Sequence, residues 1–303
     1  MDLTISIAGI PIKITFLGHT QKAIPLCHYY FGDFLCPVHV QDVEIKISVL
    51  KDTNNDSPVL KKIQSPILEQ RLCTRDVVAW LNQVPGYEAD FPINEATVSS
   101  SCLGGLLLFN PDTARGRIYL LKSGTECFRP LHRLFWMYFA QVLGERKSCF
   151  VHCAALVKNE KGYLFLGDSG AGKSSLAQTC EGSIVISDDS PILCKQNGDY
   201  LVFPSPYHQM DSLKGLDKAV VGRSARVEGL YFLTKDNRIY LEDMSKKEAV
   251  SLIIKRHILF FPYLSAEAKS ALFDFFIEAC NKIPYHNLHF PLGACVWDVI
   301  AGN

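Results

Sequence analysis

The sequence predicts a mixed α/β protein with two domains, and two observations support this prediction. Apolar and polar residues alternate through much of residues 1–125, which is the pattern of half-buried strands. In residues 126–303, strand-like runs alternate with helix-like periodicity, and a glycine-rich segment joins one such strand to one such helix. We therefore expect a β-rich N-terminal domain followed by an α/β domain. A chain of 303 residues is long enough for both.

The first strands are expected at residues 4–16 and 42–50, where apolar residues occupy roughly every second position. A further strand pair is expected at residues 105–109 and 117–121, on either side of the turn sequence NPDTARG. From Pro130 to Leu143 the apolar residues recur at three- and four-residue steps, which predicts a helix with Pro130 in its first turn. We place the domain boundary just before this helix, at residues 125 and 126.

The second domain is expected to begin with strands 150–157 and 163–166, followed by a helix at 173–180 and a strand at 183–187. Asn197-Gly198 separates two further strand-like runs and is typical of a two-residue type I′ hairpin turn. The sequence Ser-Lys-Lys-Glu at 245–248 matches a capping box and predicts a helix over 249–259. A second helix is expected over 266–283.

Composition and charge exclude several classes of protein. Thirty-one basic and thirty-one acidic residues give a formal net charge of zero, which disfavours a nucleic-acid partner. No apolar run approaches the roughly 20 residues of a membrane-spanning helix, so no membrane partner is expected. The first residues lack the features of a secretory signal, and the eleven scattered cysteines include no C-x-x-C pair. We therefore expect a cytoplasmic protein with reduced thiols.

Residues 167–174, GDSGAGKS, fit the pattern G-x-x-x-x-G-K-[ST] of a phosphate-binding loop (P-loop, or Walker A motif) in full. Its glycines let backbone N–H groups turn toward an anion, Lys173 can reach the outer phosphates, and the Ser174 hydroxyl can ligate Mg²⁺. The alternative is a glycine-rich structural turn. The predicted nucleotide-binding residues are Gly167, Asp168, Ser169, Gly170, Ala171, Gly172, Lys173, Ser174 and Ser175.

Two carboxylates follow the next strand. Asp188 and Asp189 directly follow the predicted strand at 183–187. A βαβ pattern brings the end of that strand to the same sheet edge as the P-loop. Two carboxylates at such a site can hold a metal ion and accept a proton from an attacking hydroxyl group or water. The alternative is a pair of solvated aspartates in a turn.

His152 is predicted to lie at the same place by a register argument. If strands 150–157 and 162–166 form a hairpin across the turn KNEK, Val157 pairs with Gly162 and His152 falls opposite Gly167. An imidazole there can tune the basic aspartate or contact a phosphate or metal ion. The alternative is a core histidine with satisfied hydrogen bonds. Arg223, Arg226 and Arg256 are further candidates for stabilising a transferred phosphoryl group, or are solvated surface residues.

Residues 152–175 (HCAALVKNEKGYLFLGDSGAGKSS), followed by VISDDSPIL at 185–193, resemble the catalytic domain of HPr kinase/phosphorylase and its relatives. In that family a histidine on a strand precedes the P-loop and two aspartates follow it. The resemblance implies that residues 126–303 form a phosphoenolpyruvate-carboxykinase-like P-loop kinase domain that uses ATP and Mg²⁺. It also implies that Asp188 is the general base and that Asp189 joins Ser174 at the metal site, or that the two aspartates exchange these roles. His152 and Lys173 complete the implied catalytic set.

The further segments that bacterial HPr kinases use for HPr docking and phosphorolysis are not found in this sequence, and the β-rich first domain differs from theirs. The resemblance therefore implies a diverged kinase that phosphorylates a hydroxyl group, with a serine of a protein or peptide as the expected acceptor. Two alternatives remain open: a non-catalytic nucleotide-binding regulator, and a carboxykinase-like or simple NTPase enzyme. The first domain is expected to bind the acceptor or to serve assembly, and formation of a homo-oligomer is left open.

Overall fold

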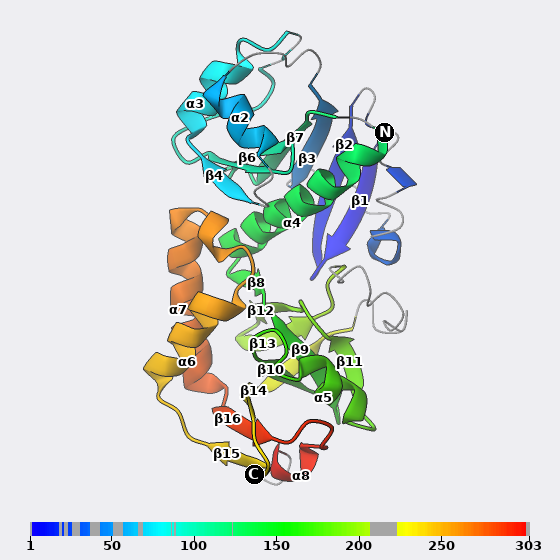
Figure 1. The fold of residues 1–303 in the computed structure, drawn as a ribbon, viewed down its shortest axis with the longest axis vertical. Coiled ribbons are helices and arrows are strands. Elements are labelled where there is room, and N and C mark those ends of the chain that lie inside the picture. Colours follow the sequence, from blue (N-terminus) through cyan, green and yellow to red (C-terminus); the bar gives the residue numbers. More distant parts are fainter. Residues whose placement is uncertain are drawn as a thin grey trace. The chain divides into compact units, whose positions relative to one another are not determined.

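The computed structural model describes residues 2–17, 20, 24–25, 31–36, 43–50, 57–65, 69–85, 87, 89–122, 124–206 and 223–300 (Figure 1). The chain forms two compact units: unit 1 comprises Met1–Glu145 and Pro262–Ala266, and unit 2 comprises Arg146–Phe261 and Glu267–Asn303. Each unit has its own β-sheet, so the prediction of a mixed α/β chain is confirmed. Within the described ranges, no helix is both long and apolar enough to cross a membrane.

Unit 1 has a seven-stranded sheet in the order β1-β2-β3-β7-β6-β5-β4. The predicted strand region at 4–16 is a hairpin, because Ala8 and Gly9 both adopt positive φ and turn the chain back. The elements of the unit are β1 (Asp2–Ile7), β2 (Ile10–Phe16), η2 (Gly32–Phe34), β3 (Glu44–Val49), α2 (Pro58–Gln64), β4 (Gln70–Leu72), α3 (Thr74–Leu81), β5 (Val98–Cys102), β6 (Gly105–Asn110), β7 (Arg115–Leu120), η3 (Gly124–Cys127) and α4 (Phe128–Glu145).

Helix α4 packs against the sheet of unit 1, and two glycines make room for it. A Cβ atom at Gly105 would lie 2.5 Å from Leu134, and one at Gly116 would lie 2.5 Å from the ring of Tyr138. Helices α2 and α3 share a separate core cluster with Leu106 and other residues of β6 and β7. The helix therefore belongs to unit 1, whereas the predicted domain boundary at residues 125 and 126 assigned it to the second domain.

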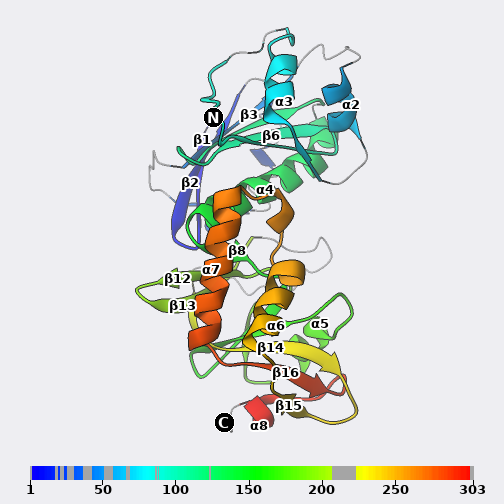
Figure 2. The ribbon, with the colours of Figure 1, turned by 90° about the vertical axis from the view of Figure 1, so that its left-hand side faces the viewer.

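Unit 2 contains β8 (Ser148–Phe150), β9 (Cys153–Lys158), β10 (Lys161–Leu166), α5 (Lys173–Thr179), β11 (Ile184–Ser187), β12 (Ile192–Gln196), β13 (Asp199–Phe203), β14 (Ala225–Lys235), β15 (Tyr240–Glu242), α6 (Lys246–Leu252), η5 (Ile253–His257), α7 (Ala266–Lys282), β16 (Tyr285–Phe290) and α8 (Trp297–Ile300); η6 (Phe261–Tyr263) spans the change of unit. The sheet has nine strands, and α5 lies on one face while α6 and α7 lie on the other (Figures 1 and 2). Ser245 caps the predicted helix by accepting a hydrogen bond from the N–H of Glu248, and the predicted turn at Asn197-Gly198 is confirmed. The helix predicted over 249–259 begins earlier and continues after Leu252 as the π-helix η5.

The sheet of unit 2 bends at a corner where two paired strands turn together. Its order is β11-β9-β10-β14-β13-β12-β8, yet the chain passes from β8 to β9 across only Val151 and His152. The segment between β11 and β12 makes the same turn, because β11 pairs with β9 and β12 pairs with β8. Two backbone hydrogen bonds join the two segments through the bend, from Val151 N to Pro191 O (2.9 Å) and from Cys153 N to Asp189 O (3.0 Å). The predicted continuous strand at 150–157 is therefore wrong, because it is broken at this corner.

The register of the β9–β10 hairpin agrees with the prediction. Gly162 pairs with Val157 and Leu166 pairs with Cys153, so His152 lies one step beyond the ladder, opposite Gly167. Strand β11 is antiparallel to β9, which is itself antiparallel to β10. The ends of β10 and β11 and the start of β9 therefore meet at one edge of the sheet, which is where the P-loop begins.

Candidate active site

The P-loop connects β10 to α5 and contains backbone conformations that require glycine. Gly170 and Gly172 have φ values of +79° and +103°, which side chains of L-residues rarely adopt. Gly172 also lies against the chain after β16: a Cβ atom there would be 2.8 Å from Leu292 and 3.0 Å from Phe290. At Gly167 the added atom would meet Ala171 at 2.6 Å. The motif's glycines therefore allow both the turn and the close packing of the loop.

Lys173 is buried at the first position of α5 and is only 7% exposed. Its ammonium group donates hydrogen bonds to the carbonyls of Gly167 (2.7 Å) and Asp168 (3.2 Å), and it lies 3.0 Å from Nε2 of His152. Burial lowers the pKa of Lys173, while the charge of Asp189 opposes this shift. The cation is thus held over the loop by groups that a bound anion can replace.

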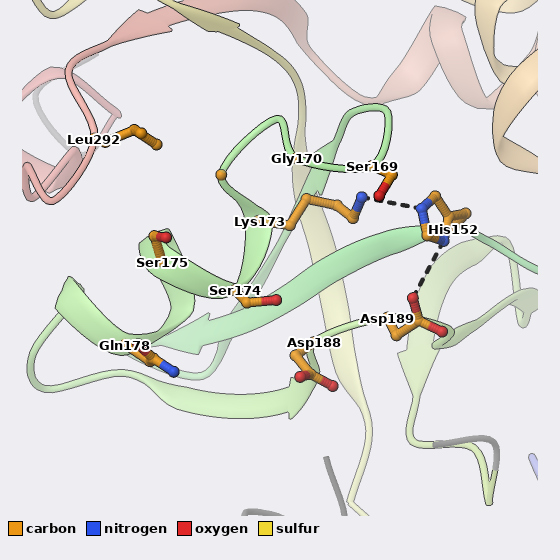
Figure 3. Close-up of a pocket in the computed structure, with 11 residues that line it drawn as sticks. His152, Ser169, Gly170, Lys173, Ser174, Ser175, Gln178, Asp188, Asp189 and Leu292 are labelled. Atoms are coloured by element: carbon orange, nitrogen blue, oxygen red, sulfur yellow. Dashed lines mark hydrogen bonds and ion pairs between the residues drawn. The ribbon is translucent and has the colours of Figure 1, made fainter. Parts of the chain in front are cut away.

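His152 joins Lys173 to Asp189 (Figure 3). An ammonium group can only donate, so the contact with Lys173 requires a lone pair on Nε2 of His152. The proton of the neutral imidazole then lies on Nδ1, which is 3.3 Å from Oδ1 of Asp189. The backbone N–H of His152 donates to the carbonyl of His257 at 2.7 Å, so the residue is fixed by both its main chain and its ring.

Asp189 is largely buried, and each of its carboxylate oxygens has a hydrogen-bond donor. Oδ1 faces His152, and Oδ2 accepts a hydrogen bond of 2.6 Å from the Ser190 hydroxyl. Burial alone would raise the pKa of Asp189, but these two hydrogen bonds and the nearby charge of Lys173 outweigh burial and lower it. Asp189 is therefore held as a carboxylate in a fixed orientation.

Asp188 is in a different environment, although it is the adjacent residue. It is half-buried, and its carboxylate forms no hydrogen bond or ion pair with any residue that the structure describes. It lines the same pocket as Ser174 at the start of α5 (Figure 3). A carboxylate with unused acceptor capacity at a pocket surface is available to a proton or a metal ion.

These side chains line one pocket of about 520 Å³, within the range of small-molecule sites. The pocket brings together predicted residues from β9, the P-loop, α5 and the end of β11. Asp168, Gly167 and Ala171 do not line it, whereas two residues that the sequence analysis did not single out, Gln178 and Leu292, do. The predicted residues that line it are His152, Ser169, Gly170, Gly172, Lys173, Ser174, Ser175, Asp188 and Asp189.

Of the three arginine candidates, only Arg256 lies at the P-loop. Its guanidinium is 2.9 Å from Oδ2 of Asp168, and both side chains are exposed. Arg226 pairs in the sheet with Lys161 at the opposite end of β10 and is ion-paired with Asp199 and Glu228. Arg223 lies two residues before the start of β14, at that same end. The structure therefore does not bring Arg223 or Arg226 to the pocket.

The pocket's donor set fits a magnesium ion bound together with phosphates. In the described part of the chain, no group of three or more His, Cys, Asp or Glu side chains could hold a metal ion by itself. Mg²⁺, however, typically takes one or two carboxylates and completes its shell with water and substrate phosphate oxygens. Ser174, Asp188 and Asp189 contribute side-chain oxygens of this kind to the pocket lining.

Comparisons with known proteins do not show which family the chain belongs to. No protein-family model matches the chain, and no curated protein matches it. Among solved structures, the chain is similar to the HPr(Ser) kinase/phosphatase from Coxiella burnetii, with 22% sequence identity over 31% of this chain and 76% of that chain, at a TM-score of 0.23. A TM-score this low does not establish a shared fold.

Proposed function

We propose that the chain is an ATP- and Mg²⁺-dependent kinase that transfers the γ-phosphoryl group to a hydroxyl group, with a serine of a peptide or protein as the acceptor. The observation that carries the proposal is the position of Asp188. Its carboxylate, without a partner among the described residues, lines the same pocket as Lys173 and Ser174 of the P-loop (Figure 3). A pocket with this composition can hold a nucleotide and deprotonate an alcohol beside it.

The proposed roles follow from the contacts of each residue. Lys173 moves its hydrogen bonds from the loop carbonyls to the outer phosphates, and the Ser174 hydroxyl and Asp189 hold the metal. Bound Mg²⁺ would supply positive charge to offset the negative charge on the phosphate oxygens. Asp188 accepts the proton of the acceptor hydroxyl group. The oxygen of that hydroxyl group bonds to the γ-phosphorus, while the bond between the γ-phosphorus and the β–γ bridging oxygen breaks. The products are ADP and a phosphate ester.

His152 is the positioning residue of this scheme. Through Nδ1 it orients the carboxylate of Asp189, and through Nε2 it limits where the ammonium group of Lys173 can lie. Phosphoryl transfer depends mainly on positioning and charge stabilisation, so a group that fixes both a cation and a metal-binding carboxylate affects the rate without reacting itself.

The motif of His152, the P-loop and Asp188-Asp189 also supports a relationship to HPr kinases. As part of the proposal, unit 2 has their phosphoenolpyruvate-carboxykinase-like fold, the protein acts in the cytoplasm, and unit 1 binds the acceptor or mediates assembly. Phosphorylation of HPr itself is not proposed, because the HPr-docking segments are missing from the sequence.

Labelled ATP tests the proposal. The protein is incubated with γ-labelled ATP, Mg²⁺ and a lysate of its source cells, and labelled residues are mapped by mass spectrometry. We expect label on a serine with the parent protein and roughly 10²- to 10⁴-fold less with Asp188→Asn, which cannot accept a proton. Asp199→Asn serves as the matched control, because Asp199 pairs with Arg226 at the other end of the sheet and should leave labelling unchanged.

Two outcomes would contradict the kinase assignment. Label released only as inorganic phosphate would favour a simple NTPase. Nucleotide binding without any turnover would favour a non-catalytic regulator.

A further inference from the structure

The pocket has two chemically different ends. One end carries the titratable side chains of His152, Lys173, Asp188 and Asp189. The other end carries uncharged side chains, those of Ser175 and Leu292 (Figure 3). A nucleoside triphosphate has the same division, because its phosphates are anionic while its base is uncharged and has apolar faces.

Leu292 is unusual among the apolar residues of the described chain. It is 55% exposed, more than any other large hydrophobic side chain in those ranges, and it is the only one of the exposed set there that lines the pocket. An exposed leucine alone is common on protein surfaces. At this position, however, it places an apolar surface inside an otherwise polar pocket.

The backbone explains why Leu292 takes this position. Pro291 to Ala294 form a turn closed by a hydrogen bond from Ala294 N to Pro291 O (3.1 Å), and Gly293 adopts a φ of +85°. Leu292 is therefore the first central residue of a tight turn, where a side chain projects outward. A Cβ atom at Gly172 would lie 2.8 Å from Cδ2 of Leu292, so the leucine lies directly against the last glycine of the P-loop.

The P-loop determines the direction in which a nucleotide runs through the pocket. Lys173 and Ser174 mark the outer phosphates and their metal ion. In Figure 3, His152 and Asp188 lie on one side of Ser174, while Ser175 and Leu292 lie on the other. A triphosphate with its outer phosphates at Lys173 can extend its nucleoside only toward the uncharged end.

We propose that Leu292 is the contact residue for the nucleobase, packing its side chain against one face of the base, with Ser175 as the neighbouring polar group. This inference rests on the proposed function, because it requires a nucleoside triphosphate in the pocket. An aliphatic contact to a base face does not distinguish adenine from guanine, so Leu292 contributes affinity for either purine nucleotide. The acceptor hydroxyl then enters at the opposite end, beside Asp188.

Calorimetric titration tests this inference by comparing the binding affinities of two ligands in the presence of Mg²⁺. ATP has both phosphates and a nucleoside, whereas inorganic tripolyphosphate has phosphates alone. We expect Leu292→Ala to weaken ATP binding on the order of tenfold, because it removes most of the apolar contact, and to leave tripolyphosphate binding unchanged. Leu292→Met, which keeps an apolar side chain of similar volume, should retain most of the parental affinity for ATP.

Phe273→Ala is the matched control, because Phe273 is 49% exposed on α7 and does not line the pocket. It should change neither affinity. Unchanged ATP binding in Leu292→Ala, or an equal loss for both ligands, would overturn the assignment of Leu292 while leaving the P-loop assignment intact. Failure of the parent protein to bind either ligand would instead overturn the proposed function, and the nucleobase contact with it.

Discussion

Substituting Lys173 tests phosphate binding when the stabilisation by a ligand, rather than the stability of the protein alone, is measured. A ligand that binds only the native state raises the free energy of unfolding by about 2.7 kcal/mol at a hundredfold excess over its dissociation constant. We expect Mg-ATP to stabilise the parent protein in thermal melts and to stabilise Lys173→Met very little. Lys195→Met, whose ammonium group pairs with Glu278 on α7, is the control and should respond to Mg-ATP as the parent does. Equal stabilisation of Lys173→Met and the parent would be incompatible with a phosphate-binding role.

Substitutions of the two adjacent aspartates should differ in their effects on stability and on phosphoryl transfer. Asp189→Asn leaves a single oxygen to accept from His152 and Ser190, so one buried donor loses its partner and the free energy of unfolding should fall by roughly 1–3 kcal/mol. Asp188→Asn removes no contact among the described residues and should leave stability nearly unchanged while phosphoryl transfer falls. Urea unfolding of both variants measures the difference. A loss of stability in Asp188→Asn that equals the loss in Asp189→Asn would show that their environments are not distinct.

His257 makes the stability of the protein depend on pH. Burial lowers its pKa from 6.5 to about 4, and the charges of His152 and Lys173 add to this shift. Between about pH 6.5 and pH 4, the unfolded chain therefore binds a proton at His257 that the folded chain does not. As the pH is lowered through this range, the free energy of unfolding decreases by roughly 3 kcal/mol in total. Above pH 6.5 this contribution to stability is fully present.

His257→Phe should reduce this acid-side slope, as measured by urea unfolding at a series of pH values. The slope should not vanish, because burial also lowers the pKa of His132 in unit 1 to about 4. An unchanged slope in His257→Phe would mean that His257 is protonated equally in the folded and unfolded states.

At the level of secondary-structure elements, the P-loop allows a paired test of glycine. Gly170 and Gly172 both have positive φ, so alanine is strained at either position. Only Gly172 also has neighbours within 4 Å of an added Cβ atom, Leu292 and Phe290. We expect Gly172→Ala to cost roughly 1–3 kcal/mol more than Gly170→Ala, because overpacking adds to the strain. Similar melting temperatures for the two variants would argue against the packing of the loop on the chain after β16.

The sequence predicted those elements of unit 2 that local rules determine. Alternation and the KNEK turn were sufficient for the register of β9 and β10, because a hairpin turn fixes which residues pair. Asn197-Gly198 and Ser245 likewise determine a turn and a helix start through their own backbone and side-chain preferences.

Other features depend on residues that are far apart in the sequence. The corner at Val151 and His152 is held by Pro191, Asp189 and His257, and apolar residues flank it on both sides, so the sequence there reads as one strand. Leu292 follows β16, and it reaches the pocket only because β16 runs parallel to β14. Strand β14 is itself two strands away from β9 in the sheet. Arg256 reaches Asp168 from a π-helix that its local sequence did not predict.

At the scale of the whole molecule, unit 1 is completed by five residues that follow most of unit 2 in the sequence. Gln141 of α4 is fully buried, and its side chain donates to the carbonyl of Tyr263 (2.6 Å) and accepts from the N–H of Ser265 (3.2 Å). The guanidinium of Arg71 also donates to the carbonyl of Leu264 at 2.6 Å. The segment Pro262–Ala266 is therefore part of the hydrogen-bonded structure of unit 1.

Gln141→Met tests this attachment in the intact chain. The substitution keeps an unbranched side chain of similar size but leaves the Tyr263 carbonyl and the Ser265 N–H without the Gln141 amide, which should lower the free energy of unfolding by roughly 1–3 kcal/mol. Amide hydrogen exchange at Ser265 should accelerate. Gln196→Met, at the exposed end of the β12–β13 hairpin, should change neither measurement. Unaltered exchange at Ser265 would show that Gln141 does not hold the segment.

The return of the chain to unit 1 sets an order of events during synthesis on the ribosome. The carbonyl that pairs with the Gln141 amide lies 122 residues later in the sequence. At elongation rates of about 5–20 residues per second, it is made roughly 6 to 24 s after Gln141. For that interval the polar end of a side chain destined for a fully buried position must be solvated or bound by another molecule. The N-terminal unit is therefore translated first, but it reaches its final hydrogen-bonded form only after most of the P-loop unit has also been made.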